Sequence, residues 1–267
     1  MDFLEQRNTI LLLFCEAEAG KMMKKYKREI QCCLLVTILL ICVGKIVPEI
    51  MSSDNSRKEK ARIKQLVEGN HNEQFSKESW YRLKADNPDF QGYLAFETGL
   101  IEMPIVQGKD NDEYLKLSFE RNQDTQGTPF MDVNCNLRSV NITVYGHNVY
   151  YDSSAKFSPL EKLTDKKEFD SNRRLFFFLE DEVREYETLY VCYVSYDDTE
   201  DFDYAKSYFV TAEIFHGWLD FLKERSLFNQ NEDVSDFDHF LTLQTCRKWN
   251  DNEHLLVVCR EVNKSDY

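Results

Sequence analysis

The chain has 267 residues, of which 42% are hydrophobic and 30% charged, and its formal net charge is −14. A single domain commonly holds about 100–200 residues, so this length allows one domain with an appendage. The 19 Phe and 14 Tyr residues are enough for a sizeable core, which excludes global disorder. A strongly acidic surface repels polyanions, and the composition therefore argues against binding of nucleic acid or anionic lipid.

The first feature along the chain is an apolar segment with a basic flank. Residues 21–29 hold five cations, and residues 30–47 (IQCCLLVTILLICVGKIV) are almost entirely apolar. Such a helix can span a bilayer, for which about 17–25 residues are needed. A cleaved signal peptide and a buried helix of a soluble protein are the alternatives. We favour an uncleaved anchor, because the preceding region is long for a signal peptide and no A-x-A site follows.

The charges around this segment predict its orientation. Five Lys/Arg precede the span, and Lys45 lies near its end, so the positive-inside rule places the N-terminus in the cytoplasm and the rest outside the cell. We expect a single-pass protein with four parts. These are a cytoplasmic segment (1–29), a transmembrane anchor (30–47), a polar stalk or linker (48–75) and a globular domain (76–267).

The globular part should begin with a short helix. Ser76 and Ser79 lie near acidic residues in SKESWYRLKADNPDF, as in a capping box. Asn87-Pro88 should end the helix or turn the chain, because the residue before a proline avoids the α region.

From residue 90 onward the chain consists of short runs rich in Val, Ile, Tyr, Phe and Thr. Nine runs have this character: GYLAFE, MPIVQG, TPFMDV, NITVYGHN, LFFFLE, ETLYVCYVSY, YFVTAE, FLTLQTC and HLLVVCREV. This pattern predicts many short strands in a β-barrel or a β-sandwich. Residues 212–228 differ, because their apolar side chains recur every three or four positions and predict an amphipathic helix. SPLEKL (158–163) predicts one further helical turn.

The cysteines differ in their surroundings. Of the eight cysteines, four follow the apolar segment: Cys135, Cys192, Cys246 and Cys259. Four extracellular cysteines could form two disulfides, yet Cys192 and Cys259 lie in apolar runs where a lone thiol behaves as a small hydrophobe. Cys246 ends a predicted strand and precedes Arg247 and Lys248, and such cations stabilise a reactive thiolate.

A cysteine nucleophile needs a base or an imidazolium partner. His147 follows a predicted strand in the glycine-containing turn of TVYGHN, and His254 opens the strand after Cys246. Spacing alone gives each histidine a structural role more often than a catalytic one. The sequence has no H-x-x-x-H or C-x-x-C ligand spacing and no Gly-rich phosphate loop, so we expect neither a metal nor a cofactor.

At these residues the sequence resembles a known family. TLQTC (242–246) resembles the T-L-x-T-C signature of sortases, and YGHN (145–148) resembles their histidine motif. NPDFQGYLAF and IEMPIVQGKDNDEYL are similar to the entry strands of class B sortases, in which a helix also lies between two late strands. The resemblance covers residues 76–263 and implies a mostly β fold, a closed barrel of about eight strands.

The resemblance also implies a membrane-anchored cysteine transpeptidase of a Gram-positive bacterium. Cys246 would attack the Thr–Gly or Thr–Asn bond of an N-P-x-T-[G/N]-like sorting signal in a secreted protein. An amine of a lipid-linked peptidoglycan precursor would then resolve the thioacyl intermediate, which fixes the protein to the cell wall. His147 would serve as general acid and base.

The family has an arginine at the start of the strand after the cysteine loop, where this sequence has His254. A protonated His254 can replace it as a weaker donor, or Arg247 or Lys248 can reach in from the loop. Arg260 is the runner-up, although six residues of strand span about 20 Å. Loss of this donor altogether would cost about 10²–10³ in rate. The alternative function is therefore a sortase-like protein that binds sorting signals or acts as a scaffold without efficient turnover.

Three further residues are candidates for substrate binding. Thr245 can offer its backbone N–H or hydroxyl to an oxyanion, or it is a plain strand residue. Gln244 can line the groove or simply alternate outward. Tyr196 follows a strand beside an acidic segment and can border the groove, although a solvated loop is the simpler interpretation.

Overall fold

The computed structural model describes residues 3–68, 75–195, 197, 202–228, 233–236, 238–247 and 250–266. The chain divides into two compact units, the first ending at Met51 and the second beginning at Ser52. The long helix α1 (Phe3–Glu68) runs through both.

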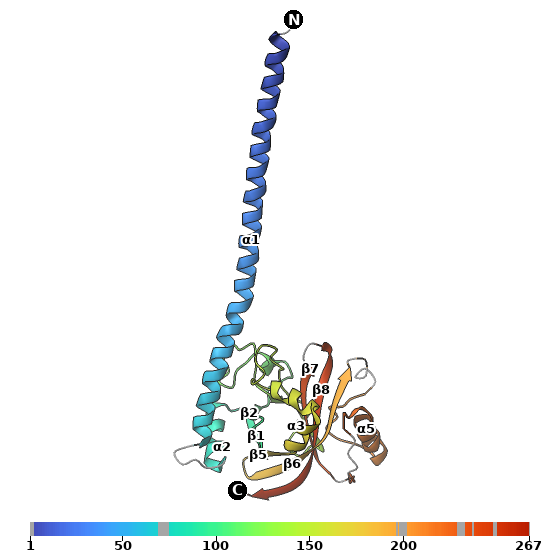
Figure 1. Cartoon of the computed structure of the whole chain (residues 1–267). Helices are drawn as coiled ribbons and strands as arrows, with labels where there is room; N and C mark the ends of the chain where they lie inside the picture. Colours follow the sequence, from blue (N-terminus) through green and yellow to red (C-terminus); the bar gives the residue numbers. More distant parts are fainter. Residues whose placement is uncertain are drawn as a thin grey trace. The chain divides into compact units, whose positions relative to one another are not determined.

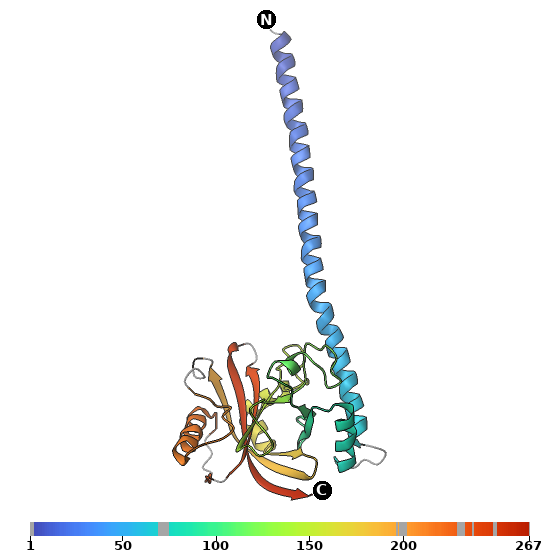
Figure 2. The same cartoon turned by 180° about the vertical axis from the view of Figure 1, so that it is seen from behind.

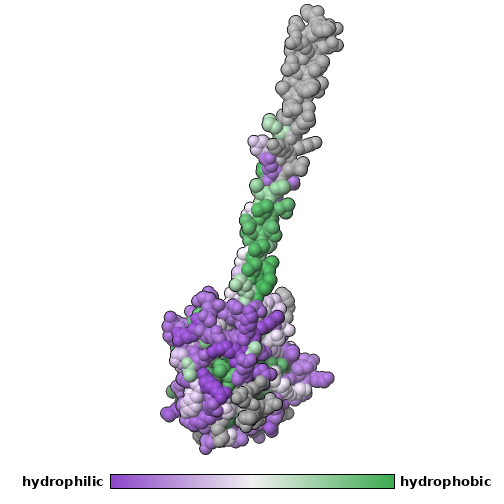
Figure 3. All heavy atoms as spheres, turned by 90° about the vertical axis from the view of Figure 1, so that its left-hand side faces the viewer, coloured by the Kyte–Doolittle hydropathy of each residue, from purple (hydrophilic) through white to green (hydrophobic). Residues whose placement is uncertain are grey.

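The predicted transmembrane segment lies in α1. Within the described residues, one helix is long and apolar enough to cross a membrane, over Glu29–Val67. None of its apolar window is buried, and large side chains such as Leu35 and Leu40 are exposed. Figure 3 shows this part of the helix as a hydrophobic stretch. An anchor or a signal segment fits this finding, whereas a buried helix of a soluble core does not.

Eight strands form a closed barrel (Figures 1 and 2). They are β1 (Phe90–Phe96), β2 (Glu102–Val106), β3 (Phe130–Met131), β4 (Asn141–Tyr145), β5 (Arg174–Phe178), β6 (Glu182–Ser195), β7 (Phe240–Arg247) and β8 (Asn250–Asp266). Their order around the barrel is β1-β2-β3-β4-β7-β8-β6-β5. The β2–β3 and β4–β7 pairs are parallel, and the other pairs are antiparallel. The predicted fold class is confirmed.

Short helices connect the strands. They are α2 (Lys77–Asp86), the 3₁₀ helices η1 (Glu113–Leu115) and η2 (Ser158–Thr164), α3 (Lys166–Ser171) and α5 (Ala212–Arg225). The hydroxyl of Ser76 accepts from the N–H of Ser79 at the start of α2, and Asn87 ends this helix, as predicted. The helical turn predicted at 158–163 is also present, as η2.

The late strands are buried on both faces. Side chains alternate across a strand, so Leu243, Leu255 and Val257 point into the barrel, where they pack in its central cluster. Phe240, Leu256 and Val258 point outward and pack against α5 through Trp218 and other apolar side chains. Figures 1 and 2 show α5 outside the barrel beside β6. Burial on both faces explains the uninterrupted apolar run LLVV in β8, where one-sided burial would give alternation.

Two expectations differ from the structure. The run YFVTAE (208–213) is not a strand, because the side chain of Thr211 caps α5 by accepting from the N–H of Ile214. An N-cap hydroxyl stabilises the helix start, whereas strand propensity depends on a ladder partner. The compact unit also begins at Ser52 rather than at residue 76. The last turns of α1 pack on the barrel, with Ile63 only 6% exposed in a cluster with Leu83 and Phe90.

The packing of α5 gives a stability prediction. Trp218 is 2% exposed, so Trp218→Ala should lower the free energy of unfolding by about 3–5 kcal/mol through the cavity that it leaves. Ile214 lies on the same helix but is 42% exposed, and Ile214→Ala should change stability by within about 0.5 kcal/mol. Urea denaturation followed by fluorescence measures both. Equal losses in the two variants would show that α5 is not packed as described.

Candidate active site

The pairing of β7 with β8 sets Cys246 directly opposite His254. Directly opposed residues have Cβ atoms about 4.5–5.5 Å apart and share a face of the sheet. Gln244 lies two residues before Cys246 and therefore shares this face, which is the outer wall of the barrel. Cys246 and Gln244 are half-buried, whereas His254 is 7% exposed.

The pairing of β7 with β4 brings His147 to the same place. The two strands run parallel, with Tyr145 beside Gln244, and this register carried two residues further sets His147 beside Cys246. Two hydrogen bonds to β7 flank His147. The N–H of Gly146 donates to the carbonyl of Gln244 at 3.0 Å, and the Asn148 Nδ2 donates to the carbonyl of Cys246 at 3.0 Å. His254 therefore faces Cys246 across the ladder, and the residues on either side of His147 bond to the backbone of Gln244 and of Cys246.

The imidazole of His147 is held by a backbone carbonyl. Its Nε2 lies 3.0 Å from the oxygen of Leu115. A carbonyl oxygen only accepts, so this contact assigns the ring proton to Nε2. In the neutral ring, Nδ1 is then the nitrogen that can take up a proton.

Gln244 fixes the tautomer of His254. The Tyr204 hydroxyl donates to Oε1 of Gln244 at 2.8 Å, so the Gln244 Nε2 amide donates to Nδ1 of His254 at 3.1 Å. This assigns the proton of the neutral His254 ring to Nε2. Burial lowers the pKa of His254 below its ordinary value of 6.5. Desolvation disfavours the charged ring, so burial favours the neutral form of His254 over the protonated donor.

Tyr204 is the residue of this site that the sequence did not indicate. Its backbone carbonyl accepts from the indole Nε1 of Trp218 at 2.9 Å, and its ring centroid lies 6.3 Å from that of His254. The residue lies in an acidic connection without any periodic signal. Only the packing of α5 against the barrel reveals its link to Gln244.

Of four other candidates, two point away from Cys246 and two lie outside the described residues. Thr245 is 1% exposed, and its hydroxyl has no hydrogen-bond partner among the described residues. It faces the barrel interior, so a role of this hydroxyl beside Cys246 is excluded by the alternation of the strand. Arg247 stacks over the ring of Tyr193 at 4.0 Å and pairs with Glu253, which raises the pKa of its guanidinium. Tyr196 and Lys248 lie outside the described residues.

The structure separates Arg260 from Cys246. Arg260 pairs with Phe240, at the opposite end of β7. Its guanidinium donates to the carbonyl of Asp233 at 2.8 Å and lies 3.8 Å from Glu187. The runner-up for the arginine role is therefore not part of this site, because the strand between the two positions is continuous.

The remaining barrel cysteines are buried, whereas Cys246 is half-buried. Burial raises the pKa of Cys135 to about 11 and those of Cys192 and Cys259 to about 12. No disulfide joins the cysteines whose side chains the structure describes. Among those described residues, no group of three or more His, Cys, Asp or Glu side chains could hold a metal ion.

A closed barrel with a cysteine at the end of β7 and a histidine after the adjacent β4 defines the molecule as a barrel of the sortase class. Solved structures agree. Sortase B from Clostridium perfringens matches with a TM-score of 0.64 and 30% identity, over 69% of this chain and 100% of that chain. Sortase B from Bacillus anthracis in complex with AAEK1 matches with a TM-score of 0.70 and 25% identity, over 80% of this chain and 99% of that chain.

Curated relatives point to the same family. Sortase B of Staphylococcus aureus is 26% identical over 248 residues, which cover 91% of this chain and 98% of that protein. Sortase B of Listeria monocytogenes is 31% identical over 169 residues, or 62% of this chain and 66% of that protein. No family model matches the chain. The chain belongs to the sortase B family, a family of cysteine transpeptidases.

The exposure of the thiols gives a labelling prediction. In the full chain, iodoacetamide at pH 7.5 should modify Cys246 at least about tenfold faster than Cys135, because only the thiolate reacts and burial suppresses it at Cys135. His147→Ala should slow the labelling of Cys246 and leave that of Cys135 unchanged. Peptide mass spectrometry measures each site separately. Equal rates at Cys246 and Cys135 would contradict an activated thiol.

The burial of His254 gives a pH prediction. The unfolded chain protonates this histidine near pH 6.5, whereas the folded chain does so only at lower pH. The unfolded state then holds more protons, so the free energy of unfolding should fall as the pH drops below about 6.5. The variant His254→Gln should lack this part of the pH dependence. Urea denaturation of the full chain in detergent at pH 7.5 and 5.5 tests it. If the free energy of unfolding changed equally between the two pH values in the parent and in the variant, the prediction would be refuted.

Proposed function

We propose that the chain is a membrane-anchored transpeptidase in which Cys246 is the nucleophile and His147 the general acid and base. The observation that carries the proposal is the position of Cys246 between these two histidines, with His254 opposite it on β8 and His147 beside it after β4. A half-buried thiol at a strand end, next to an imidazole, is the arrangement that nucleophilic cysteine chemistry needs.

The substrate is a sorting signal of the N-P-x-T-[G/N] type in a secreted protein. Support comes from family membership and from a solved complex of Staphylococcus aureus sortase B with substrate, which shares this fold. The Cys246 thiol gives its proton to His147, the resulting thiolate attacks the threonine carbonyl carbon, and the carbonyl electrons move to oxygen. The oxyanion then collapses, the C–N bond breaks, and His147 gives a proton to the departing amine.

The second half of the reaction uses an amine of a lipid-linked peptidoglycan precursor. This amine attacks the thioester carbonyl, His147 takes its proton, and the Cys246 thiolate leaves. The product is a new amide bond that joins the secreted protein to the cell wall. Water in place of the amine would give hydrolysis by the same steps.

His254 lies at the position of the family's arginine. It offers one neutral N–H, whereas an arginine offers several N–H donors on a charged guanidinium. The Tyr204 hydroxyl orients the Gln244 amide, which donates to Nδ1 of His254, so the proton of the neutral ring is on Nε2. A single neutral donor is weaker than a guanidinium. We therefore assign His254 a donor role for the oxyanion or the substrate backbone, at a lower rate than an arginine would give.

The proposed topology follows the charge pattern. Residues 1–29 are cytoplasmic, residues 30–47 cross the membrane, and the barrel lies outside the cell. The apolar helix supports this arrangement. The catalytic part includes residues 76–267 and, in addition, the end of α1 that packs on the barrel.

The second candidate function is a sorting-signal binder without efficient turnover. The burial of His254, which lowers the pKa of the ring at the arginine position, is the observation that favours it. The two functions differ in whether an acyl adduct forms on Cys246.

The deciding experiment uses the full chain in detergent and quenched peptides of the N-P-x-T-G and N-P-x-T-N types, with and without a peptide amine. We expect cleavage and an acyl adduct on Cys246 by mass spectrometry, with cleavage lost in Cys246→Ala and reduced by about 10²-fold or more in His147→Ala. Arg260→Ala is the matched control, because Arg260 lies on β8 opposite Phe240, at the far end of β7 from Cys246, and it should retain parental cleavage.

The variant His254→Arg separates the two functions. If His254 is a weaker donor, His254→Arg should raise kcat by up to about 10²-fold. Peptide binding without any adduct in the parent, with turnover appearing in His254→Arg, would support the binder and contradict the enzyme.

A further inference from the structure

His147 is held by two loops as well as by β7. The carbonyl of Leu115, at the end of η1, accepts from its imidazole. The backbone carbonyl of His147 accepts from the N–H of Phe157 at 3.0 Å, and the adjacent residues Asn148 and Lys156 form a β-bridge. The position of His147 therefore depends on residues 113–128 and on residues 148–157.

Backbone hydrogen bonds connect the two halves of the first loop, residues 113–128. The N–H of Asp124 donates to the carbonyl of Lys116 at 3.0 Å, and the N–H of Thr128 donates to that of Tyr114 at 3.0 Å. A Cβ at Gly127 would lie 2.4 Å from the oxygen of Tyr114, so the two halves of the loop are in close contact. A hydrogen bond thus connects Asp124 to the backbone of Lys116, the residue next to Leu115.

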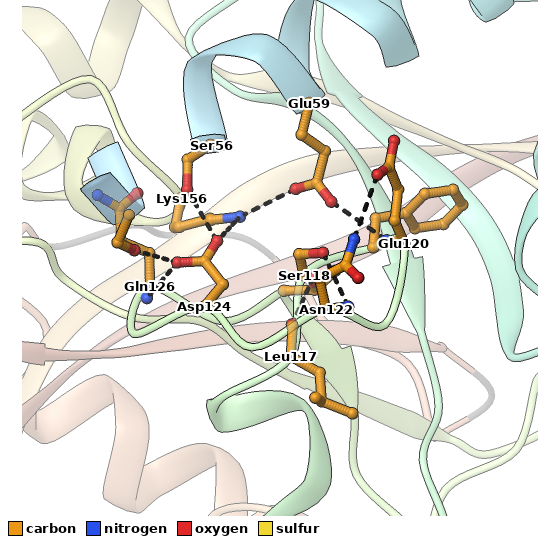
Figure 4. A network of polar contacts seen from close by, with 12 residues as sticks. Ser56, Glu59, Leu117, Ser118, Glu120, Asn122, Asp124, Gln126 and Lys156 are labelled. Atoms are coloured by element: carbon orange, nitrogen blue, oxygen red, sulfur yellow. Dashed lines mark hydrogen bonds and ion pairs between the residues drawn. The ribbon is translucent and has the colours of Figure 1, made fainter. Parts of the chain in front are cut away.

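One face at the end of α1 contacts both loops. Ser52, Ser56 and Glu59 recur at helical spacing and point to the same side. The hydroxyls of Ser52 and Ser56 donate to the two oxygens of Asp124, the latter at 2.8 Å. Figure 4 shows Ser56 and Glu59 reaching from the helix toward Asp124 and Lys156 on the loops.

Lys156 joins the two loops to the helix. Its Nζ lies 3.6 Å from Oε2 of Glu59 and 4.0 Å from Oδ2 of Asp124. Oε1 of Glu59 accepts from the N–H of Glu120 at 3.2 Å, in the first loop. The side chains of Lys156, Glu59 and Asp124 are 11%, 9% and 3% exposed. Removing Lys156 would leave the two buried carboxylates without this cation, so its contacts select one arrangement of both loops and the helix.

The backbone at Lys156 also requires support. Its φ is 46°, a left-handed conformation that residues other than glycine rarely adopt. Such a conformation persists where the surrounding contacts hold it in place. The ion pairs to Glu59 and Asp124 supply contacts of that kind, one residue from the hydrogen bond between Phe157 and His147.

We propose that residues 52–59 of α1 position His147 for the reaction, with Asp124 and Lys156 as the positioning residues that transmit the contact. The inference rests on the proposed function only in taking His147 as the acid and base. The helix that follows the apolar span is then part of the active-site scaffold and not a passive stalk.

The test uses the full chain in detergent and three variants. Lys156→Met removes the buried ammonium, Lys156→Arg restores a cation, and the pair Ser52→Ala with Ser56→Ala removes two hydroxyls with little effect on volume. Lys58→Met is the matched control, because Lys58 is on the same helix, 72% exposed, and pairs only within the helix with Asp54 among the contacts described. Circular dichroism measures the folded fraction of each variant.

Two readouts separate positioning from simple destabilisation. Lys156→Met and the double serine variant should lower kcat about tenfold or more, with KM within about twofold, because a small misplacement of a catalytic group can cost 10²-fold. The pH midpoint of Cys246 alkylation should rise in both, since a displaced imidazole stabilises the thiolate less. Lys156→Arg should recover much of the loss. Partial unfolding would lower the amplitude of labelling without moving its midpoint.

The outcomes also separate this inference from the proposed function. If kcat and the alkylation midpoint of both variants equal those of Lys58→Met, the positioning role is overturned, whatever the parent does with peptides. A parent that cleaves no peptide contradicts the proposed function, while a raised midpoint in Lys156→Met and the double serine variant would still support the scaffold role of α1.

Discussion

β7 runs between a parallel and an antiparallel neighbour, and its register in both ladders determines the candidate site. A slip of one residue would turn Cys246 from the outer wall to the barrel interior. The slip is costly because both faces of β7 are buried. Leu243 would leave the central cluster and Phe240 would leave the face covered by α5. Packing against two separate cores thus fixes the position of one thiol.

The same packing buries His254 away from solvent. A guanidinium at this position would stay charged, whereas the buried imidazole is kept neutral and is oriented by Gln244. The orientation depends in turn on Tyr204, whose carbonyl is held by Trp218 of α5. The outer helix therefore contributes to the site through a hydrogen-bonded chain and not through a side chain of its own.

The buried charges between α1 and the loops have a different role from the apolar clusters. A buried ion pair contributes little net stability, because desolvation offsets much of the attraction. It does select one arrangement, since any other would leave Asp124 or Lys156 without its partner. Apolar contacts in the cluster around Ile63 hold α1 against the barrel. The polar contacts of Asp124 and Lys156 determine which residues of α1 face the loops.

The sequence by itself determined the local elements and indicated Cys246 and His147 as the candidate residues. Strand periodicity, the amphipathic pattern of α5, the cap at Ser76 and the motifs around Cys246 and His147 all depend on residues close together in the chain. Tertiary structure alone decided the contacts between residues that are distant in the sequence. Ser56 and Asp124 are 68 residues apart, Tyr204 and Gln244 are 40 apart, and the pKa of His254 depends on what covers it. No local pattern encodes such contacts, because they form only when distant segments are buried against each other.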